Sequence, residues 1–266
     1  MTALITGASG GLGRALAAEC AAKGYDLFLT DISEQGLLEI KHGILRQYDV
    51  AVHTQVCDVT NPREVADLFA AIDARGIELN MFLGVAGIDF EGGFTQRGCD
   101  QILDIVNINI AATLRVTHAA LEHRDTSQKF NVVIVSSLAS QYPIPLKATY
   151  AASKRFLLDF SIALRQELMH DNVNVLALCP AGLTTTQQAL DGIAAQGFMG
   201  RVTTVSLPTV ARKTISKTLA GKATYTPGAV NRLLAVFGKL LPKSLIARLL
   251  YNRWSAAQEK WLDVSA

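Results

Sequence analysis

The chain has 266 residues, half of them hydrophobic, and a formal net charge of +2. This length and composition predict one large α/β domain with a sizeable core and exclude a disordered chain. The hydrophobic residues come in short runs, and the first residues have no leader pattern, so neither a transmembrane helix nor secretion is expected. The scattered cysteines and histidines favour a reduced, cytoplasmic protein without a metal site.

Short apolar runs alternate with helical patterns along the first 180 residues. Strands are predicted at 3–6, 25–30, 51–59, 80–86, 131–137 and 172–179, and helices near 12–24, 33–47, 62–75, 99–123 and 149–170. After Pro180 a loop at 183–206, a helix near 208–220 and a short strand at 223–228 follow. This alternation predicts a Rossmann-like, doubly wound parallel sheet of about seven strands with helices on both faces.

A glycine-rich stretch, TGASGGLG at 6–13, joins the first strand to the first helix. In this position Gly7 permits a tight turn, while Gly11 and Gly13 allow a close approach to the pyrophosphate of a dinucleotide. The alternative is a plain glycine turn without a ligand.

Asp31 ends the second strand, 24 residues after Gly7. A carboxylate at this point binds the ribose diol of adenosine and repels a 2′-phosphate, which favours NAD over NADP. Arg14 is the one nearby cation and keeps NADP as an alternative. Asp31 also has two plainer interpretations, as a residue of a solvated loop or as a cap for the helix that starts near Ser33.

Tyr150 and Lys154 are four residues apart and share one face of a predicted helix. A phenol is a poor base at neutral pH, and a nearby ammonium group favours its ionised form. Ser137 is predicted to end the fifth strand, at the carboxyl edge where open parallel sheets bind ligands.

At this point the sequence resembles the short-chain dehydrogenase/reductase family over nearly its whole length. TGASGGLG resembles the family's TGxxxGxG, and YAASK resembles its YxxxK. VSSLAS, IVNINIAA, CDVT and CPAGLTT resemble the stretches that carry its serine, its asparagine and two cofactor contacts. The resemblance implies an NAD(P)-dependent oxidoreductase acting on CH–OH groups.

The resemblance also implies a role for each matching residue. Tyr150 would be the acid/base, Lys154 would bind the nicotinamide ribose and lower the tyrosine pKa, Ser137 would orient the substrate oxygen, and Asn109 would hold a relay water. The implied cofactor residues are Gly7, Ser9, Gly11, Leu12, Gly13, Asp31, Asp58, Val59, Ala86, Gly87, Tyr150, Lys154, Pro180, Gly182, Leu183 and Thr185.

Two stretches depart from the family pattern. The family's NNAG is GVAG here, at 84–87, so both asparagine side chains are missing. Ala181 stands where a glycine is expected, with Gly182 one residue later. These departures leave a second hypothesis open, a catalytically silent nucleotide-binding regulatory or scaffold protein.

Apolar residues on both sides of the site predict a hydrophobic substrate, such as a steroid, an acyl chain or another apolar ketone. Ser137, Tyr142, Ile144, Tyr150 and Leu190 are the candidate substrate contacts. The helices 99–123 and 149–170 are expected to build a homodimer or homotetramer, as the family implies.

The division predicted from these patterns is a catalytic domain at 1–228, with 183–206 as its substrate lid, and a helical extension at 229–266 split by Pro242. Residues 192–258 contain ten basic and no acidic residues. Three interpretations of 231–254 stay open: packing on a subunit, contact with an anionic membrane surface, or attraction of an anionic substrate. Nucleic acid binding is not expected, because no aromatic platform is present.

Overall fold

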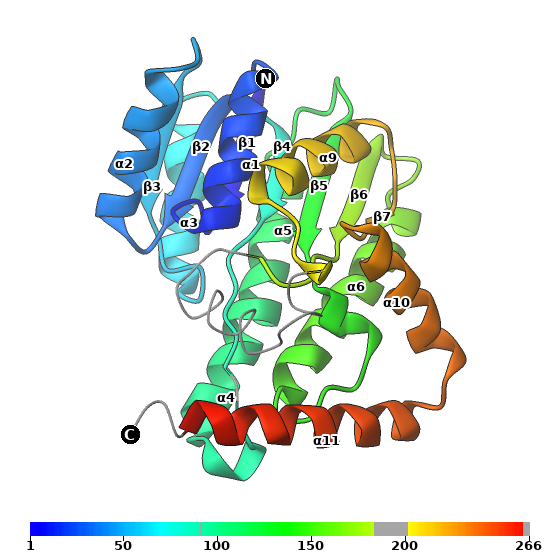
Figure 1. Ribbon diagram of the computed structural model, residues 1–266. Coiled ribbons are helices and arrows are strands. Elements are labelled where there is room, and N and C mark those ends of the chain that lie inside the picture. The colour runs from blue at the N-terminus through cyan, green and yellow to red at the C-terminus, as the bar shows by residue number, and fades with distance from the viewer. Residues whose placement is uncertain (91, 184–201, 263–266) are drawn as a thin grey trace.

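Seven parallel strands form one sheet in the computed structural model, which describes residues 1–90, 92–183 and 202–262 (Figure 1). Their order across the sheet is β3-β2-β1-β4-β5-β6-β7. The bounds are β1 Thr2–Thr6, β2 Asp26–Asp31, β3 Val52–Val56, β4 Leu79–Gly84, β5 Phe130–Val135, β6 Val173–Leu178 and β7 Thr224–Tyr225. The predicted doubly wound sheet is confirmed.

Alternate side chains of each strand enter two separate cores, because successive residues point to opposite faces of a sheet. On one face, Ile5 and Leu29 pack with α1 (Gly11–Ala22), α2 (Glu34–Leu45) and α9 (Leu207–Leu219). On the other, Leu4 and Phe28 pack with α3 (Pro62–Asp73), α5 (Thr113–Glu122) and α6 (Ala148–Glu167). Both faces are therefore covered, as strands that are apolar throughout require.

The predicted helix at 99–123 is interrupted. It consists of α4 (Cys99–Val106), a π-helical turn η2 (Asn107–Ala112) and α5. Such turns insert one extra residue per turn and are frequent at functional sites. The periodicity of the apolar residues continues through the interruption, so it does not reveal the change of helix type.

Five strands end earlier than predicted. β3 ends at Val56 rather than at residue 59, and β5 ends at Val135 rather than at Ser137. The other three are β4, β6 and β7, which end at Gly84, Leu178 and Tyr225 rather than at 86, 179 and 228. Ser137 instead caps the short 3₁₀ helix η3 (Leu138–Gln141), where its hydroxyl accepts a hydrogen bond from the Ala139 N–H. A buried residue directly follows β3, β5 and β6, namely Cys57, Ser136 and Cys179, so burial continues past the last paired residue of these strands.

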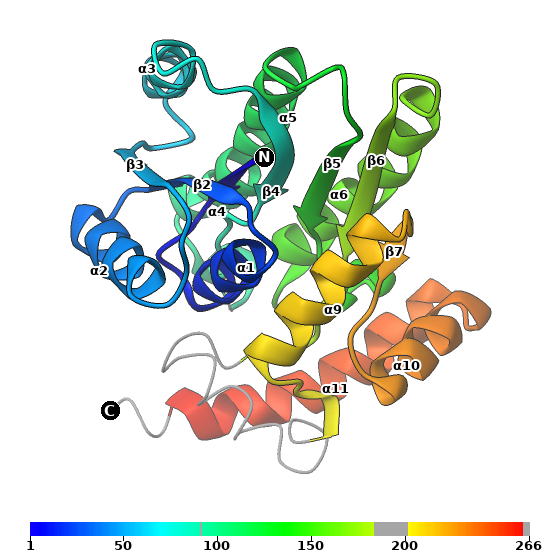
Figure 2. The same cartoon turned by 90° about the horizontal axis from the view of Figure 1, so that it is seen from above.

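The strand order reverses between β1 and β4, and ligands of open α/β sheets bind in the crevice outside the carboxyl ends at such a point. α10 (Ala229–Leu240) and α11 (Lys243–Leu262) follow β7 and are separated at Leu241 and Pro242, as predicted. Figures 1 and 2 show both helices outside the layers of the sheet, with α11 across the end toward which β5 points. Within the described residues, no helix combines the length and the apolar character needed to cross a bilayer.

Candidate active site

The glycine-rich turn after β1 is a tight cradle. Gly7 has φ of +63°, and a Cβ placed on it would lie 2.7 Å from the Ala86 nitrogen. A Cβ on Gly13 would lie 2.2 Å from the Gly7 carbonyl oxygen. Only glycine fits these two positions. Gly10 caps α1 without any side-chain hydrogen bond, so the helix N-terminus presents backbone N–H groups to an anion. The turn therefore fits a dinucleotide pyrophosphate.

Asp31 braces this turn with both of its carboxylate oxygens. Oδ2 accepts a hydrogen bond from the Ser9 N–H at 3.0 Å, and Oδ1 accepts one from the Ser33 N–H at 3.2 Å. The residue is partly exposed, and each oxygen keeps a second lone pair for a ribose hydroxyl. The helix cap expected at Asp31 is supplied by Ser33 instead, whose hydroxyl accepts a hydrogen bond from the Gly36 N–H at 3.1 Å. Asp31 therefore orders the turn before α2 and does not cap the helix.

Arg14, the other candidate for the adenosine end, is held in place by α2. Its Nε donates to the Ser9 carbonyl at 2.7 Å, and its Nη2 lies 2.9 Å from Glu39 Oε2. The guanidinium also holds the pKa of Glu39 below its usual value. A 2′-phosphate would have to compete with Glu39 for this cation.

The turn after β3 holds the next pair of predicted cofactor residues. Asp58 is exposed, and its Oδ1 accepts hydrogen bonds from the Thr60 N–H at 2.9 Å and the Thr60 hydroxyl at 2.7 Å. Val59 is buried at its side. The carboxylate therefore shapes the turn and stays open to solvent.

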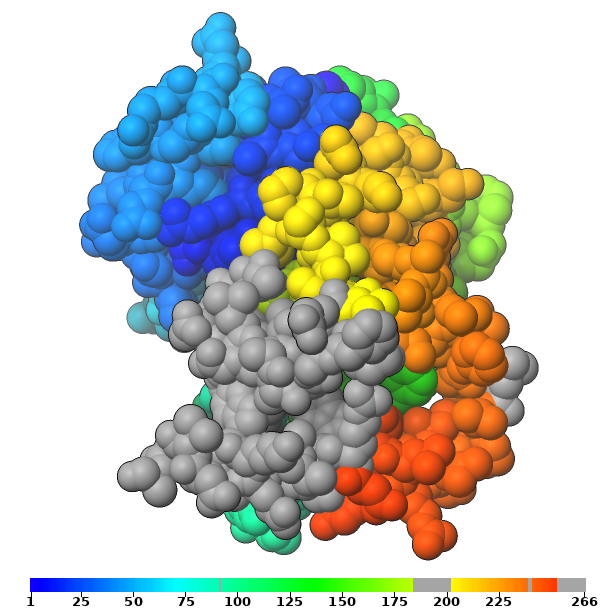
Figure 3. Space-filling view, in the orientation of Figure 1, coloured from blue at the N-terminus to red at the C-terminus, as the bar shows by residue number. Residues whose placement is uncertain are grey.

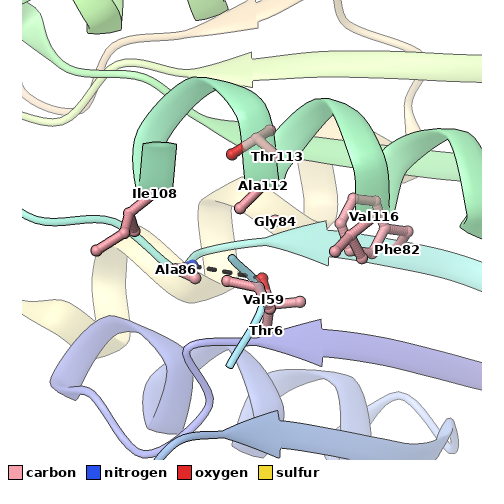
Figure 4. A pocket seen from close by; sticks show the side chains of 9 residues that line it. All are labelled: Thr6, Val59, Phe82, Gly84, Ala86, Ile108, Ala112, Thr113 and Val116. Carbon is pink, nitrogen blue, oxygen red and sulfur yellow. Dashed lines mark hydrogen bonds between the residues drawn. The ribbon is translucent and has the colours of Figure 1, made fainter. Parts of the chain in front are cut away.

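Thr6 holds the GVAG turn, in which the family's two asparagines are missing. Its Oγ1 accepts hydrogen bonds from the N–H groups of Val85 at 3.2 Å and Ala86 at 3.4 Å. Below this turn lies a cavity of about 10 Å³, lined in part by Thr6, Gly84 and Ala112 (Figure 4). Its volume is about that of one water. The backbone of GVAG is thus held in place without asparagine.

Asn109 lies fully buried in the π-helical turn and joins three segments. Its Nδ2 donates to the Ile88 carbonyl at 3.0 Å and to the Ser153 hydroxyl at 3.1 Å, and its Oδ1 accepts from the Ile88 N–H at 2.9 Å. Both amide protons are therefore used by the protein. A relay water at Asn109 would have to donate to Oδ1 or bind the main chain.

Lys154 lies beside this network and is almost fully buried. Its Nζ donates to the Val135 carbonyl at 3.0 Å, at the end of β5. A Cβ on Gly87 would lie 3.2 Å from Nζ and 2.9 Å from Asn109 Oδ1, so glycine leaves room for both groups. Burial lowers the pKa of Lys154 to about 8, against an opposing effect of the Asp89 carboxylate.

Ser137 meets the end of β6 and faces Tyr150. Its hydroxyl donates to the Pro180 carbonyl at 3.4 Å. It also hydrogen-bonds Tyr150, an interaction that lowers the pKa of the phenol. The neighbouring Ser136 hydroxyl donates to the Lys154 carbonyl at 2.7 Å and ties α6 to this loop.

The pKa of Tyr150 is raised to about 12, first by burial and then by the Asp89 carboxylate. Lys147 and Ser137 oppose this effect. Lys154 Nζ and Lys147 Nζ each lie 5.7 Å from the centre of the Tyr150 ring. Without a bound nucleotide, the lysines therefore do not lower the pKa of the phenol below its ordinary value.

The predicted substrate side is only partly described. Tyr142 and Ile144 are half-buried after η3, and α10 packs on Tyr142, because a Cβ on Gly238 would lie 2.3 Å from Tyr142 Cε1. Gly182 is exposed, and Leu183 packs against the core on the α1 side. Thr185 and Leu190 lie outside the described residues.

Sequence reasoning missed two charged residues next to Tyr150. Lys147 Nζ lies 2.6 Å from Asp89 Oδ2, so the loop after β4 is joined to the loop before α6. The Gly92 N–H strengthens this link by donating to the Leu146 carbonyl at 2.9 Å. No local pattern could have found a pair 58 residues apart.

The fold and this constellation are those of a class of oxidoreductases with a Rossmann-like sheet. The sequence matches the family described as short chain dehydrogenase over residues 1–192, and the chain belongs to this family.

Named relatives differ in activity. The chain is 30% identical over 175 residues to a very-long-chain 3-oxoacyl-CoA reductase from Laccaria bicolor, covering 65% of this chain and 52% of that protein. It is 33% identical over 188 residues to an inactive hydroxysteroid dehydrogenase-like protein 1 from Rattus norvegicus. This match covers 70% of this chain and 57% of that protein. The chain thus spans just over half the length of both relatives.

A solved structure has the same fold. It is a short-chain dehydrogenase from Sphingobium yanoikuyae in complex with NADPH, with a TM-score of 0.77 and 24% identity. The similarity covers 90% of this chain and 93% of that one.

Proposed function

We propose that this protein transfers a hydride between NAD(H) and a secondary alcohol or its ketone, and that the substrate is apolar. One observation carries the proposal. Tyr150 and Lys154 on α6, Ser137 after β5 and Asn109 in the π-helical turn converge at the carboxyl edge of the sheet, next to the glycine turn. A protein that only binds nucleotide has no need of a half-buried phenol at this point.

The residues act on the substrate oxygen. A nicotinamide nucleotide bound beside these residues would supply or accept the hydride. In the reducing direction, the neutral Tyr150 phenol gives its proton to the oxygen of the ketone, and the Ser137 hydroxyl holds that oxygen beside it. In the oxidising direction, the phenolate accepts the proton. Lys154, in reach of Tyr150 and of the Val135 carbonyl, binds the nicotinamide ribose and stabilises the phenolate.

NAD is the proposed cofactor, with NADP as the alternative. A carboxylate at Asp31 repels a 2′-phosphate, and the most suitable cation for that phosphate, Arg14, is bound to Glu39. The Sphingobium yanoikuyae structure is a complex with NADPH, which supports NADP as the alternative.

An apolar ketone of the acyl or steroid kind is the proposed substrate class. Tyr142 and Ile144, half-buried in the segment between Ser137 and Tyr150, are the proposed apolar contacts of the substrate. The name of the Laccaria bicolor relative, a very-long-chain 3-oxoacyl-CoA reductase, supports an acyl chain. Residues 183–206 are proposed as the lid of the cleft.

We also propose a homodimer or homotetramer built through α4 and α6. Leu103 and Val106 on α4 and Phe156 and Ile162 on α6 are large apolar residues with 36–48% exposure. Light scattering of the purified protein tests this assembly, and a monomer would contradict it.

The competing function is a nucleotide-binding protein without turnover. The relative from Rattus norvegicus is named inactive, and the GVAG turn lacks the family's asparagines. Tyr150→Phe separates the two functions. An enzyme should lose its activity on apolar ketones by about 10²- to 10⁴-fold and still bind NADH in a fluorescence titration. If the unmodified protein binds NADH and reduces none of a panel of acyl and steroid ketones, the silent function is correct.

A further inference from the structure

The two C-terminal helices carry an apolar surface that the catalytic proposal does not use. Large apolar side chains on α10, at its C-cap and in the first two turns of α11 are 44–58% exposed. They are Leu233, Val236, Phe237, Leu241, Leu245 and Leu249. Figure 3 shows this part of the chain at the surface of the molecule. We call these six residues the tail surface.

The helical periodicity explains why the tail surface faces outward. On α10, Leu233, Val236 and Phe237 lie on one side, whereas Asn231 and Gly238 are buried on the other. On α11, Leu245 and Leu249 share a face, and Ile246 packs inward. Each helix thus already has an anchored face, and its second apolar face is not needed for the core.

Basic residues flank the tail surface. Arg232, Lys243 and Arg248 are exposed beside the apolar side chains. Residues 192–258 contain ten bases and no acid, whereas residues 1–191 have 21 acids against 14 bases. The positive charge is therefore concentrated in the segment that also exposes the apolar residues.

Exposed apolar side chains flanked by basic residues favour some partners of the tail surface over others. A symmetric dimer would place the same patch against itself and bring these bases together, which is unfavourable. A lipid surface with anionic head groups satisfies both features, because apolar side chains enter the acyl boundary and bases contact the head groups.

We propose that the tail surface docks on an anionic lipid bilayer without crossing it. The inner side of α10 contacts Tyr142 through Gly238, and its outer side carries Leu233 and Phe237. Docking would leave only the thickness of α10 between Tyr142 in the proposed cleft and the lipid. Apolar substrates dissolve in this lipid. This last link depends on the proposed function, but the docking itself does not.

Sedimentation with lipid vesicles tests the docking and needs no turnover. Vesicles of phosphatidylcholine with about 30% phosphatidylserine should bind the full-length protein at low salt. Pure phosphatidylcholine should bind it at least about tenfold more weakly, and high salt should weaken binding to the anionic vesicles.

Two variants and two matched controls locate the surface. The charge variant Arg232→Glu, Lys243→Glu, Arg248→Glu should bind anionic vesicles at least about tenfold more weakly. The apolar variant Leu233→Ser, Phe237→Ser, Leu249→Ser should lose binding as well. The controls make the same changes at exposed residues elsewhere and should bind like the unmodified protein; they are Lys23→Glu, Arg63→Glu, Lys129→Glu and Leu38→Ser, Leu45→Ser, Leu219→Ser.

Three results would overturn the proposal. The first is no sedimentation of the unmodified protein with anionic vesicles at low salt. The second is an equal loss of binding in variants and controls. The third is an apolar variant that changes the molar mass in light scattering and leaves vesicle binding unchanged, which would assign the tail surface to a second copy of the chain. Circular dichroism checks that each variant is folded.

Discussion

Lys147 Nζ lies 2.6 Å from Asp89 Oδ2, and this ion pair stands next to the Tyr150 ring. The two charges act on the phenol in opposite directions, because the carboxylate of Asp89 raises the pKa of Tyr150 and the ammonium of Lys147 lowers it. Asp89 also raises the pKa of Lys154. The charged groups around the phenol therefore come from α6, from the loop before it and from the loop after β4.

Asp89→Asn is expected to shift the pH dependence of alcohol oxidation to lower pH. Oxidation requires the phenolate, so its rate rises through the pKa of Tyr150. Removing the negative charge lowers that pKa, and the rising limb should move down by about half to one pH unit. Lys147→Met should move it up. The measurement is the pH profile of kcat/KM with NAD and an apolar secondary alcohol.

The control for this pair is Asp159→Asn, which removes an exposed carboxylate paired with Arg155 on the same helix. Its pH profile should match that of the unmodified protein. If the pH profiles of all three variants shifted together, or that of Asp89→Asn did not shift, the ion pair would only connect two loops and would not set the pKa of Tyr150.

Asp31→Ala is expected to remove the preference for NADH over NADPH by weakening NADH about tenfold. Arg14 stays bound to Glu39, so the single change should improve NADPH binding little. Adding Glu39→Gln releases Arg14 and should strengthen NADPH. Fluorescence titration of both nucleotides measures these affinities.

Asp31→Asn separates the charge of this residue from its structural role. Asparagine keeps an acceptor for the Ser9 N–H but cannot repel a phosphate. The Asp31→Asn variant should lose the preference for NADH over NADPH and keep the free energy of unfolding of the unmodified protein. Tighter binding of NADPH than NADH to the unmodified protein would overturn the assignment of Asp31.

Two glycine-to-alanine changes in helices should have opposite effects on stability. Gly43 on α2 has open space where a Cβ would be, so Gly43→Ala should raise the free energy of unfolding by about 0.5 to 1 kcal/mol. Gly238→Ala on α10 would bring Cβ within 2.3 Å of Tyr142 Cε1 and should lower it by about 1 to 3 kcal/mol. Denaturant unfolding measures both.

The same pair reports on the substrate cleft. Because Tyr142 must move to make room for the methyl group that Gly238→Ala adds, the KM of apolar ketones should change while NADH affinity does not. Gly43→Ala should alter neither. If the two substitutions changed KM equally, α10 would not form part of the substrate cleft.

Lys154→Met is expected to abolish activity and to stabilise the fold at neutral pH. Burial lowers the pKa of Lys154 from 10.5 to about 8. Below pH 8 the lysine is charged in both the folded and the unfolded protein, so the full cost of burying the charge lowers the free energy of unfolding. This cost disappears as the pH rises from 8 to 10.5, because the folded protein then holds the neutral amine. The variant should therefore gain on the order of 2 kcal/mol below pH 8, and the gain should shrink at higher pH.

Denaturant unfolding of both proteins at several pH values from 7 to about 10 measures this difference. Lys23→Met, at an exposed position, should show no pH-dependent difference from the unmodified protein. A constant stability difference for Lys154→Met across this range would mean that Lys154 has an ordinary pKa in the folded state.

The sequence determined the sheet, its approximate strands and the positions of the motif residues. Apolar runs of strand length reflect burial on both faces, and TGASGGLG, Ser137 and YAASK have fixed spacings within local elements. These features depend on neighbours along the chain, so one sequence is enough to predict them. It also predicted the break at Pro242, since proline ends helices by itself.

Only the tertiary structure decided which distant groups meet. Asp89 and Lys147 flank Tyr150, Thr6 braces the turn that lacks asparagine, Glu39 holds Arg14, and Gly238 admits Tyr142. The sequence also did not reveal the π-helical turn at Asn109, because it predicted one continuous helix at 99–123. Each of these depends on contacts between residues far apart in the chain, and the packing of the whole domain sets those contacts rather than any local pattern.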